Sequence, residues 1–250
     1  MLEMIKEKEY FIHYYDTDKK LKLSIISLMK FFEDLALLQS EDREIGLDYY
    51  EKNNLGWLLH QFEIRIKEYP KFKDKIVLRT IPLSFLRFYA HRIFEVYNDN
   101  DDIIISADTI WLFVDTKTRK PKTVNEDMYR GYCVTPGKNE FQKLINPQPP
   151  EKIEFEKEFR IRFSDIDTNN HVNNVSYVSW ALEALPIEIL QKNEIELIRI
   201  LFKKELQYGM MIKSQAEVKT EEEKIISLHS ILDQLGNCAC NVEIHWKPTT

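Results

Sequence analysis

The order of apolar and polar positions predicts a strand, a helix and a run of further strands in the first half of the chain. Residues 7–15 (EKEYFIHYY) are aromatic and β-branched enough for a strand, which ends in a polar turn. Ser24 then stands where it would cap a helix. The apolar positions of that helix, spaced to form one buried face, are Ile25, Leu28, Phe32, Leu35 and Leu38. Four long strand-like runs follow between residues 57 and 116, so the pattern predicts an α+β fold with an antiparallel sheet.

The same series begins again after a proline-rich stretch. Residues 135–152 hold four of the nine prolines and little apolar periodicity, which is typical of a linker. A strand is predicted over 153–163, a helical stretch over about 174–190 with an interruption at Pro186, and four strand-like runs after it. We therefore expect two domains, 1–134 and 153–250, joined by a linker at 135–152.

The polar turns of the two series indicate an internal duplication. Placing the halves side by side puts Asp16 on Asp165 and Asp18 on Asp167, with an offset of 149 residues in both cases. The order of whole elements agrees as well, which is the signature of a repeated unit. The copies differ in chemistry, because Lys20 and Lys22 of the first turn stand where the second has Asn169 and His171.

Composition and spacing exclude several classes of protein. With 35 basic and 41 acidic residues the net charge is −6, which argues against a general nucleic-acid binder. No stretch approaches the roughly 18 uninterrupted apolar residues of a membrane span, and we expect a cytoplasmic protein. The glycine spacing allows neither a dinucleotide-binding loop nor a G-x-S-x-G elbow, and no two histidines stand four apart. Cys133, Cys238 and Cys240 suggest neither a disulfide framework nor a zinc site, so no metal or cofactor is predicted.

The densest polar chemistry lies between Ser164 and Asn174, wedged between an apolar strand and an aromatic helix. If strand geometry persists there, Asp167, Asn169 and His171 point to the same side, near the start of the following helix. The unpaired N–H groups of that helix start could hold a developing oxyanion, and Asn173 or Asn174 could supply the cap. Each residue alone is an ordinary turn former. Their combination in only one of the two copies favours a functional site.

The segment FSDIDTNNHVNNVSYVSWALEALP resembles the C-terminal motif of the acyl-acyl carrier protein (acyl-ACP) thioesterases, in its core Asp-x-Asn-x-His-Val-Asn-Asn. Weaker resemblance extends over nearly the whole chain. It implies two tandem hot-dog domains, each a long helix wrapped by an antiparallel sheet. It also implies catalytic roles for Asp167, Asn169 and His171, and for Glu205 on a downstream strand. The cysteine that often follows this glutamate in the family is Leu206 here, so a thiol at that position is not essential in this chain.

By this resemblance the chain is expected to hydrolyse acyl-ACP and release a fatty acid in fatty acid biosynthesis. Asn169 or helix N–H groups would stabilise the oxyanion, Glu205 or His171 would activate water, and Asp167 would position its neighbours or attack directly. The first domain would house the acyl tail. Its candidate lining residues, for which core packing is the competing interpretation, are Phe31, Phe32, Leu35, Trp57 and Leu58.

The expected partner is the acidic acyl carrier protein. Two basic groups are candidate docking positions, namely Lys117, Arg119, Lys120 and Lys122, or the lysines at 19, 20 and 22. The alternative functions are an acyl-CoA thioesterase, which the same residues would serve, and a non-catalytic acyl-binding module. A hot-dog hydratase is disfavoured because only three residues separate Asp167 from His171. A monomer with two units could hold a complete site, and a homodimer through sheet edges stays open.

Overall fold

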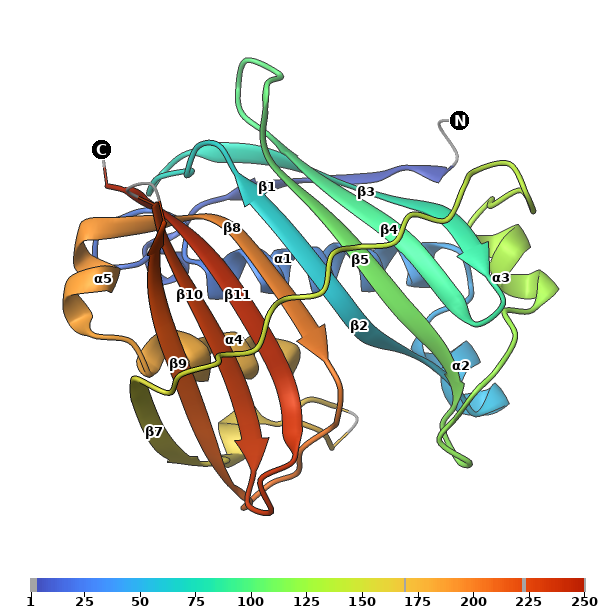
Figure 1. Cartoon of the computed structure of the whole chain (residues 1–250). Coiled ribbons are helices and arrows are strands. Elements are labelled where there is room, and N and C mark those ends of the chain that lie inside the picture. Colours follow the sequence, from blue (N-terminus) through green and yellow to red (C-terminus); the bar gives the residue numbers. More distant parts are fainter. Residues whose placement is uncertain (1–3, 169, 222–223, 250) are drawn as a thin grey trace. The chain divides into compact units, whose positions relative to one another are not determined.

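Residues 4–168, 170–221 and 224–249 are described by the computed structural model of the chain (Figure 1). They form two compact units, one of Met1–His60 with Ile66–Leu144 and the other of Gln61–Arg65 with Ile145–Thr250. The boundary at Leu144 and Ile145 falls inside the stretch 135–152, which has neither helix nor strand. Strand β2 (Leu55–Ile66) contributes residues to both units.

The first unit is an antiparallel sheet with a long helix. Its strands β1 (Lys6–Phe11), β3 (Lys75–Leu86), β4 (Tyr89–Tyr97) and β5 (Ile103–Asp115) follow one another in the order β1-β3-β4-β5, and the short β6 (Lys120–Pro121) pairs with β5. Helix α1 (Ile25–Asp42) contacts β1 and β3. A 3₁₀ turn (Tyr14–Asp16) and the short helices α2 (Leu47–Asn53) and α3 (Glu126–Gly131) complete the unit.

Helix α1 begins and faces the sheet as its sequence predicts. The Ser24 side chain accepts a hydrogen bond from the Ser27 N–H at 3.1 Å, which satisfies one of the free N–H groups of the first turn. Leu28, Phe32 and Leu35 are almost fully buried. The Phe32 ring packs against Phe94 of β4 with a centroid separation of 4.7 Å. Each such side chain contributes about 1.5–3 kcal/mol through burial, which fixes this face of the helix against the sheet.

The second unit repeats the plan. Strands β7 (Phe155–Arg160), β8 (Asn193–Phe202), β9 (Met211–Glu221), β10 (Lys224–Asp233) and β11 (Cys238–Pro248) are antiparallel in the order β8-β11-β10-β9-β7, and residues 61–65 of β2 pair with β8. Helix α4 (Asn174–Glu183) contacts β9, β10 and β11. A 3₁₀ turn (Phe163–Asp165) precedes α4, and α5 (Ile187–Lys192) follows it after the interruption predicted at Pro186.

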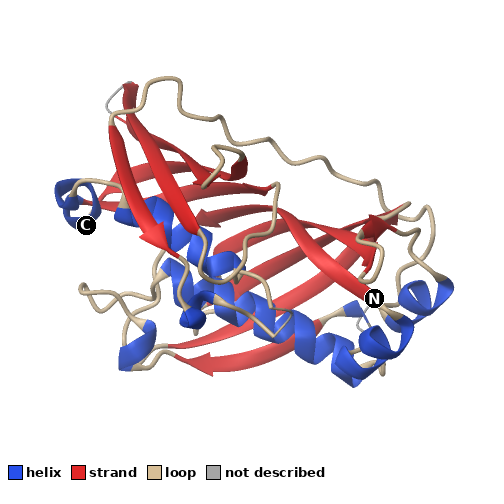
Figure 2. Cartoon of the chain, turned by 90° about the horizontal axis from the view of Figure 1, so that it is seen from below, coloured by secondary structure: helices blue, strands red, loops and turns tan. Residues whose placement is uncertain are grey.

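The predicted α+β class and the predicted long helix are confirmed, and Figure 2 separates the helices from the strands of both units. One predicted run was wrong. Residues 85–97 do not form one strand, because a tight turn at Arg87 and Phe88 ends β3 at Leu86 and starts β4 at Tyr89. Arg87 adopts a positive φ of 55° without the glycine or asparagine that usually announces such a turn. Among the described residues, no helix has the length and apolar character needed to cross a membrane.

Candidate active site

The candidate site is built on the polar turn between β7 and α4. Its entry is anchored by a pair of backbone bonds, from Ile161 N–H to Met210 O at 2.9 Å and from Gly209 N–H to Ile161 O at 3.1 Å. The buried Asp165 carboxylate then accepts the Arg162 backbone N–H at 2.8 Å and the Arg162 guanidinium Nη2 at 2.8 Å. These charge-assisted bonds fix the 3₁₀ turn, so Asp165 has a structural role.

Two hydrogen bonds between Asp167 and His171 close the next turn. The Asp167 N–H donates to the His171 carbonyl at 2.8 Å, and the His171 N–H donates to Asp167 Oδ1 at 3.1 Å. Ile166 and Val172 form an antiparallel bridge beside them, and Asn170 takes a left-handed φ of 62°. The strand geometry expected for this segment was therefore wrong. The Asp167 carboxylate reaches the His171 backbone because the chain reverses between them, not because it stays extended.

His171 approaches Glu205, which lies 34 residues further along the chain. The distance from His171 Nε2 to Glu205 Oε2 is 3.6 Å, and the two side chains are 22% and 33% exposed. This separation is longer than a direct hydrogen bond and short enough for charge attraction or for a shared water. A partly exposed imidazole and carboxylate in this arrangement can exchange protons with a bound substrate or water.

Glu205 is placed by contacts on both sides of it. It lies in the segment between β8 and β9, so the expectation of a strand position was wrong. The Val172 N–H donates to the carbonyl of the buried Leu206 at 3.1 Å, which joins this segment to the polar turn. The Tyr177 hydroxyl of α4 donates to the Lys204 carbonyl at 3.2 Å. Burial raises the pKa of Tyr177, which keeps its hydroxyl protonated as a donor.

Tyr177 is a positioning residue that the sequence analysis missed. It belongs to the aromatic helix after the motif, where its aromatic character alone indicated only core packing. A helical tyrosine three residues after Asn174 is the signal that could have drawn attention to it, since a buried tyrosine hydroxyl usually needs a partner.

Helix α4 begins at Asn174, three residues after His171. The Asn173 side chain accepts the Val175 N–H at 3.1 Å, and the Asn173 N–H donates to the Asp165 carbonyl at 2.8 Å. Asn173 is therefore the cap, one of the two residues predicted for it. Its side-chain oxygen thereby satisfies one of the free N–H groups of the first turn of α4. Asn169, the expected oxyanion donor, lies outside the described residues.

The five candidate acyl-lining residues all lie in the first unit. Phe32 and Leu35 are core residues of α1, and Phe31 stacks on Tyr10 with centroids 4.5 Å apart. On β2, Trp57 packs against Phe113, while Leu58 is half-buried. The structure thus places these residues in two groups, three on α1 and two on β2.

The described residues show no metal cluster, and a surface cavity in the first unit is polar. No group of three or more His, Cys, Asp or Glu residues there is arranged to hold a metal ion. A surface cavity of about 220 Å³ opens in the first unit. Its lining includes Glu68, Asp74 and Asp99, so its polarity does not suit an acyl tail.

Two units of this kind, each an antiparallel sheet with a helix against it, define a tandem hot-dog protein. The family models for the acyl-ACP thioesterase N-terminal and C-terminal domains match residues 3–132 and 149–248. The chain belongs to the acyl-ACP thioesterase family. The second match contains the whole polar turn and Glu205.

Named relatives agree with this assignment. The chain is 26% identical over 207 residues to an oleoyl-acyl carrier protein thioesterase of Coriandrum sativum, a match that covers 77% of this chain and 54% of the relative. It is 23% identical over 260 residues to an acyl-[acyl-carrier-protein] hydrolase of Cuphea viscosissima, covering 98% and 62%. The chain therefore spans little more than half the length of these curated relatives. A structure from Lactobacillus plantarum, described as that of an oleoyl thioesterase, has the same fold, with a TM-score of 0.93 at 20% identity over 98% of this chain and 97% of the other.

Proposed function

We propose that the chain hydrolyses the thioester of acyl-ACP and releases a free fatty acid, as a step of fatty acid biosynthesis. The observation that carries this proposal is the approach of His171 to Glu205, at 3.6 Å, beside the first turn of α4. Membership in the acyl-ACP thioesterase family supports the choice of a thioester as the bond that is cleaved.

In the proposed reaction, a water bound beside His171 and Glu205 loses a proton to one of them and attacks the thioester carbon. The carbonyl oxygen becomes an oxyanion, for which Asn169 is the proposed donor; one such donor is worth about 3 kcal/mol. Collapse of the tetrahedral intermediate breaks the C–S bond, and the departing sulfur takes a proton from the protonated base. The products are a carboxylic acid and the carrier thiol, so water supplies all the atoms added.

The contacts of Asp167 support a positioning role over direct attack. Its Oδ1 already accepts the His171 N–H and closes the turn that presents the imidazole. Asparagine at this position could accept the same bond but could not form an anhydride. We therefore expect Asp167→Asn to lower kcat by at most about tenfold, whereas a nucleophilic role would lead to a loss of several orders of magnitude.

The two domains are assigned different tasks in this proposal. The C-terminal domain, 153–250, carries Asp167, Asn169, His171 and Glu205. The N-terminal domain, 1–134, binds the acyl chain along Phe31, Phe32, Leu35, Trp57 and Leu58, and 135–152 links the two. Apolar packing is observed at two of these positions, where Phe32 contacts Phe94 and Trp57 contacts Phe113.

The decisive experiment follows thiol release from acyl carrier and CoA thioesters of increasing chain length. We expect turnover of acyl-ACP, and a loss of about 10²–10⁴ in kcat for Glu205→Gln and for His171→Ala, with unchanged melting temperatures. Glu188→Gln, at an exposed position of α5, is the matched control and should keep full activity. Near-normal turnover in either site variant would remove that residue from the mechanism.

The same panel separates the alternatives. Preference for CoA thioesters would identify an acyl-CoA thioesterase, and binding of acyl thioesters without release of thiol would identify an acyl-binding module. A cytoplasmic location and a homodimer remain predictions. Cell fractionation tests the first, and sedimentation of the purified chain tests the second.

A further inference from the structure

The first unit contains a turn with the same backbone as the candidate active site. We call the segments 16–22 and 69–74 the lysine turn. The Asp18 N–H donates to the Lys22 carbonyl at 2.8 Å, as the Asp167 N–H does to His171. The Leu23 N–H donates to Pro70 O at 2.8 Å, as the Val172 N–H does to Leu206. Segment 69–74 therefore corresponds to 205–210, and Tyr69 stands in the place of Glu205.

The net charges of the two turns are opposite in sign. The lysine turn carries five lysines and three aspartates, a net charge of +2, in a chain whose total is −6. The corresponding residues 165–171 and 205–210 carry three carboxylates and neither lysine nor arginine, a net charge of −3. The five lysines are Lys19, Lys20, Lys22, Lys71 and Lys73. Such a difference between copies with one backbone indicates a different kind of partner.

The carboxylates of the lysine turn are engaged with its own backbone. Asp18 Oδ1 accepts the Lys20 N–H at 2.7 Å, and Asp74 Oδ2 accepts the Lys71 N–H at 2.7 Å. The side chains of Lys19 and Lys71 are exposed and form no ion pair with a carboxylate of the described residues. Their charge is available to a partner.

Lys73 occupies a backbone position that disfavours lysine. Its φ is +77°, and the corresponding residue of the other turn, with φ +82°, is Gly209. Any residue with a Cβ is strained in this region, and glycine is not. The exposed Lys73 side chain makes a cation–π contact with Phe72 at 5.3 Å, which does not require the lysine to be there for folding. The first copy thus has a lysine at a backbone position where the second copy has a glycine.

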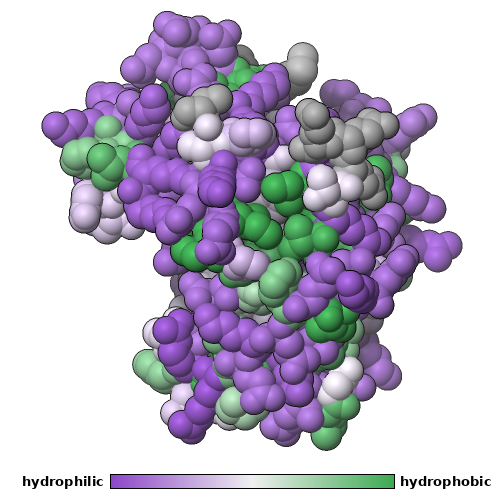
Figure 3. All heavy atoms as spheres, turned by 60° about the vertical axis from the view of Figure 1, so that its left-hand side comes forward, coloured by the Kyte–Doolittle hydropathy of each residue, from purple (hydrophilic) through white to green (hydrophobic). Residues whose placement is uncertain are grey.

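Apolar side chains stand among these lysines. Tyr15 is 78% exposed and Leu21 is 45% exposed, where the other turn has Ser164 and Asn170. On the face drawn in Figure 3, hydrophilic residues cover most of the surface and apolar residues form smaller groups among them. Exposed aromatic residues are enriched at the centre of protein interfaces, and polar residues form the rim around that centre.

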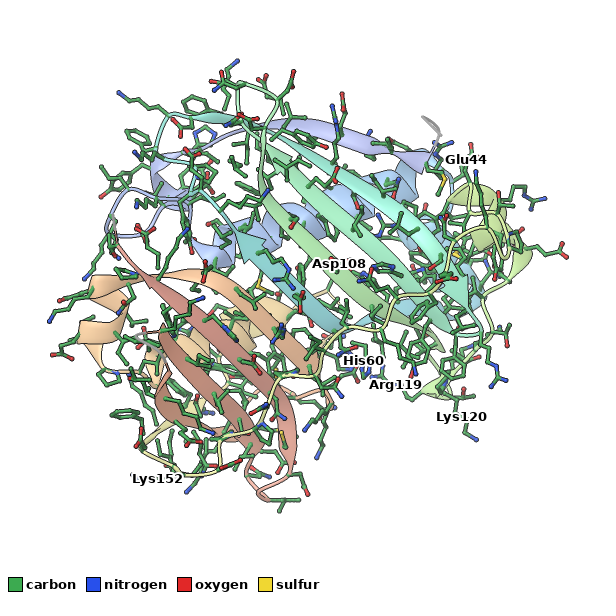
Figure 4. All side chains as sticks on the ribbon, turned by 45° about the horizontal axis from the view of Figure 1, so that its top comes forward. Glu44, His60, Asp108, Arg119, Lys120 and Lys152 are labelled. Carbon is green, nitrogen blue, oxygen red and sulfur yellow. The ribbon has the colours of Figure 1, made fainter. Side chains whose placement is uncertain are left out.

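The other basic group of this unit lacks such a centre. Lys117, Arg119, Lys120 and Lys122 surround the β5–β6 turn, where Lys120 extends outward (Figure 4). No aromatic residue between 87 and 144 is among the exposed large hydrophobic residues, and the exposed Leu86 just before this range is aliphatic. The lysine turn lies near the start of β5, since its Pro70 and Asp74 line one cavity with Ile104, and Lys117 follows the end of β5. A 13-residue strand separates the two groups, a span of roughly 40 Å.

We propose that the lysine turn is the docking surface for an acidic protein face, that of the carrier which delivers the acyl thioester. The inference rests on the proposed function. Lysines steer the acidic partner and fix its register, while Tyr15 and Leu21 supply the apolar contact. One copy of the duplicated turn thus receives the carrier, and the other acts on its cargo.

The test replaces three lysines by the residues that the same backbone carries in the second unit. The variant Lys19→Thr, Lys71→Gln, Lys73→Gly should fold, because Thr168, Gln207 and Gly209 occupy these positions in the other turn. The matched control Lys117→Gln, Lys120→Gln, Lys122→Gln removes the same charge from the β5–β6 turn. For each protein, kcat/KM is measured on acyl-ACP and on a short acyl-CoA, at 20 mM and 500 mM salt, together with the Kd of unacylated carrier.

We expect the first variant to lower kcat/KM for acyl-ACP about tenfold at low salt, with the difference vanishing at high salt. The kcat/KM of this variant for acyl-CoA should be unchanged. The control variant should keep its kcat/KM for both substrates. Equal losses on both substrates, equal losses in the control, or no loss at all would overturn the docking assignment. If no thioester is cleaved, the proposed function fails, and the Kd of the carrier still decides the docking surface by itself.

Discussion

The polar turns of the two units share one backbone and hold different side chains. In both, a buried aspartate accepts a backbone N–H three residues before it, from His13 to Asp16 at 3.0 Å and from Arg162 to Asp165 at 2.8 Å. Both turns also contain a left-handed residue, Leu21 or Asn170. The aspartates therefore belong to the framework of the turn. What differs between the copies is the chemistry placed on that framework.

The same comparison extends into the two interiors. Phe94 of β4 pairs with Thr80, and at the corresponding place in the second unit His229 of β10 pairs with Ala216. Phe94 packs on Phe32, whereas His229 hydrogen-bonds Ser227 through Nε2 at 2.9 Å. Among the described residues, His229 Nδ1 is buried without a hydrogen-bond partner. The second unit therefore has a buried polar side chain, His229, at the position where the first unit has the packed aromatic ring of Phe94.

Exchanging the central residue of the turns should have the largest effect. His171→Lys, which installs the residue of the first copy, should lower kcat/KM about 10³-fold because a protonated lysine cannot replace the imidazole as a base. The melting temperature should stay within about 2 °C, since Lys22 already occupies this backbone. Kinetics and calorimetry on one preparation measure kcat/KM and the melting temperature. The reciprocal variant Lys22→His is the control, and its kcat/KM for acyl-CoA should be unchanged. A comparable loss in Lys22→His would contradict the assignment of catalysis to the second turn alone.

Removing the framework aspartates should destabilise the two turns unequally. Asp165→Ala should lower the free energy of unfolding by about 3 kcal/mol, because the buried carboxylate bonds both the backbone and the guanidinium of Arg162. Asp16→Ala should lower it by about 1.5 kcal/mol, since Asp16 accepts only the His13 N–H among the described contacts. Urea unfolding followed by circular dichroism measures both values. Equal losses would show that the guanidinium adds nothing.

The second unit should be the more acid-sensitive one. Burial lowers the pKa of His229 to about 3, below its ordinary 6.5. The unfolded chain therefore takes up a proton below pH 6.5 that the folded chain refuses, so stability is complete above pH 6.5 and falls as the pH drops toward 3. The slope is about 1.4 kcal/mol per pH unit, or about 2 kcal/mol at pH 5.

Urea titrations at pH 7.5, 6 and 5 measure this slope against His229→Phe, which copies Phe94. In this variant the free energy of unfolding should no longer depend on the titration of His229. Its pH dependence should therefore be shallower and reflect only the remaining titratable groups. Identical slopes in the two proteins would refute the assignment to His229.

The smallest effect should come from the left-handed position shared by the turns. Gly209→Lys should cost about 1 kcal/mol from backbone strain alone, because a Cβ there would meet no atom within 4 Å. Lys73→Gly should gain somewhat less, since glycine is also more flexible in the unfolded chain. Thermal melting of both variants checks the opposite signs. Two changes of the same sign would show that the strain at Lys73 is relieved in another way.

The sequence alone determined the α+β class, the long capped helix and the duplication of the plan. These follow from local periodicity and from the 149-residue offset of two aspartates, which do not depend on distant contacts. It also located the polar turn and narrowed the cap to Asn173 or Asn174, of which the structure shows Asn173. The short helices α2 and α3 were missed because seven and six residues give too little periodicity to recognise.

Only the tertiary structure decided how the candidate site is assembled. The bond from Val172 to Leu206 brings Glu205 to His171, and no pattern along the chain specifies a contact across 34 residues. The reversal at Asn170 likewise replaced the expected strand geometry, because a left-handed residue turns the backbone where alternation would have continued. Secondary structure depends on residues that are neighbours in the sequence. The approach of His171 to Glu205 depends instead on hydrogen bonds that form only when the sheet and the helix have packed.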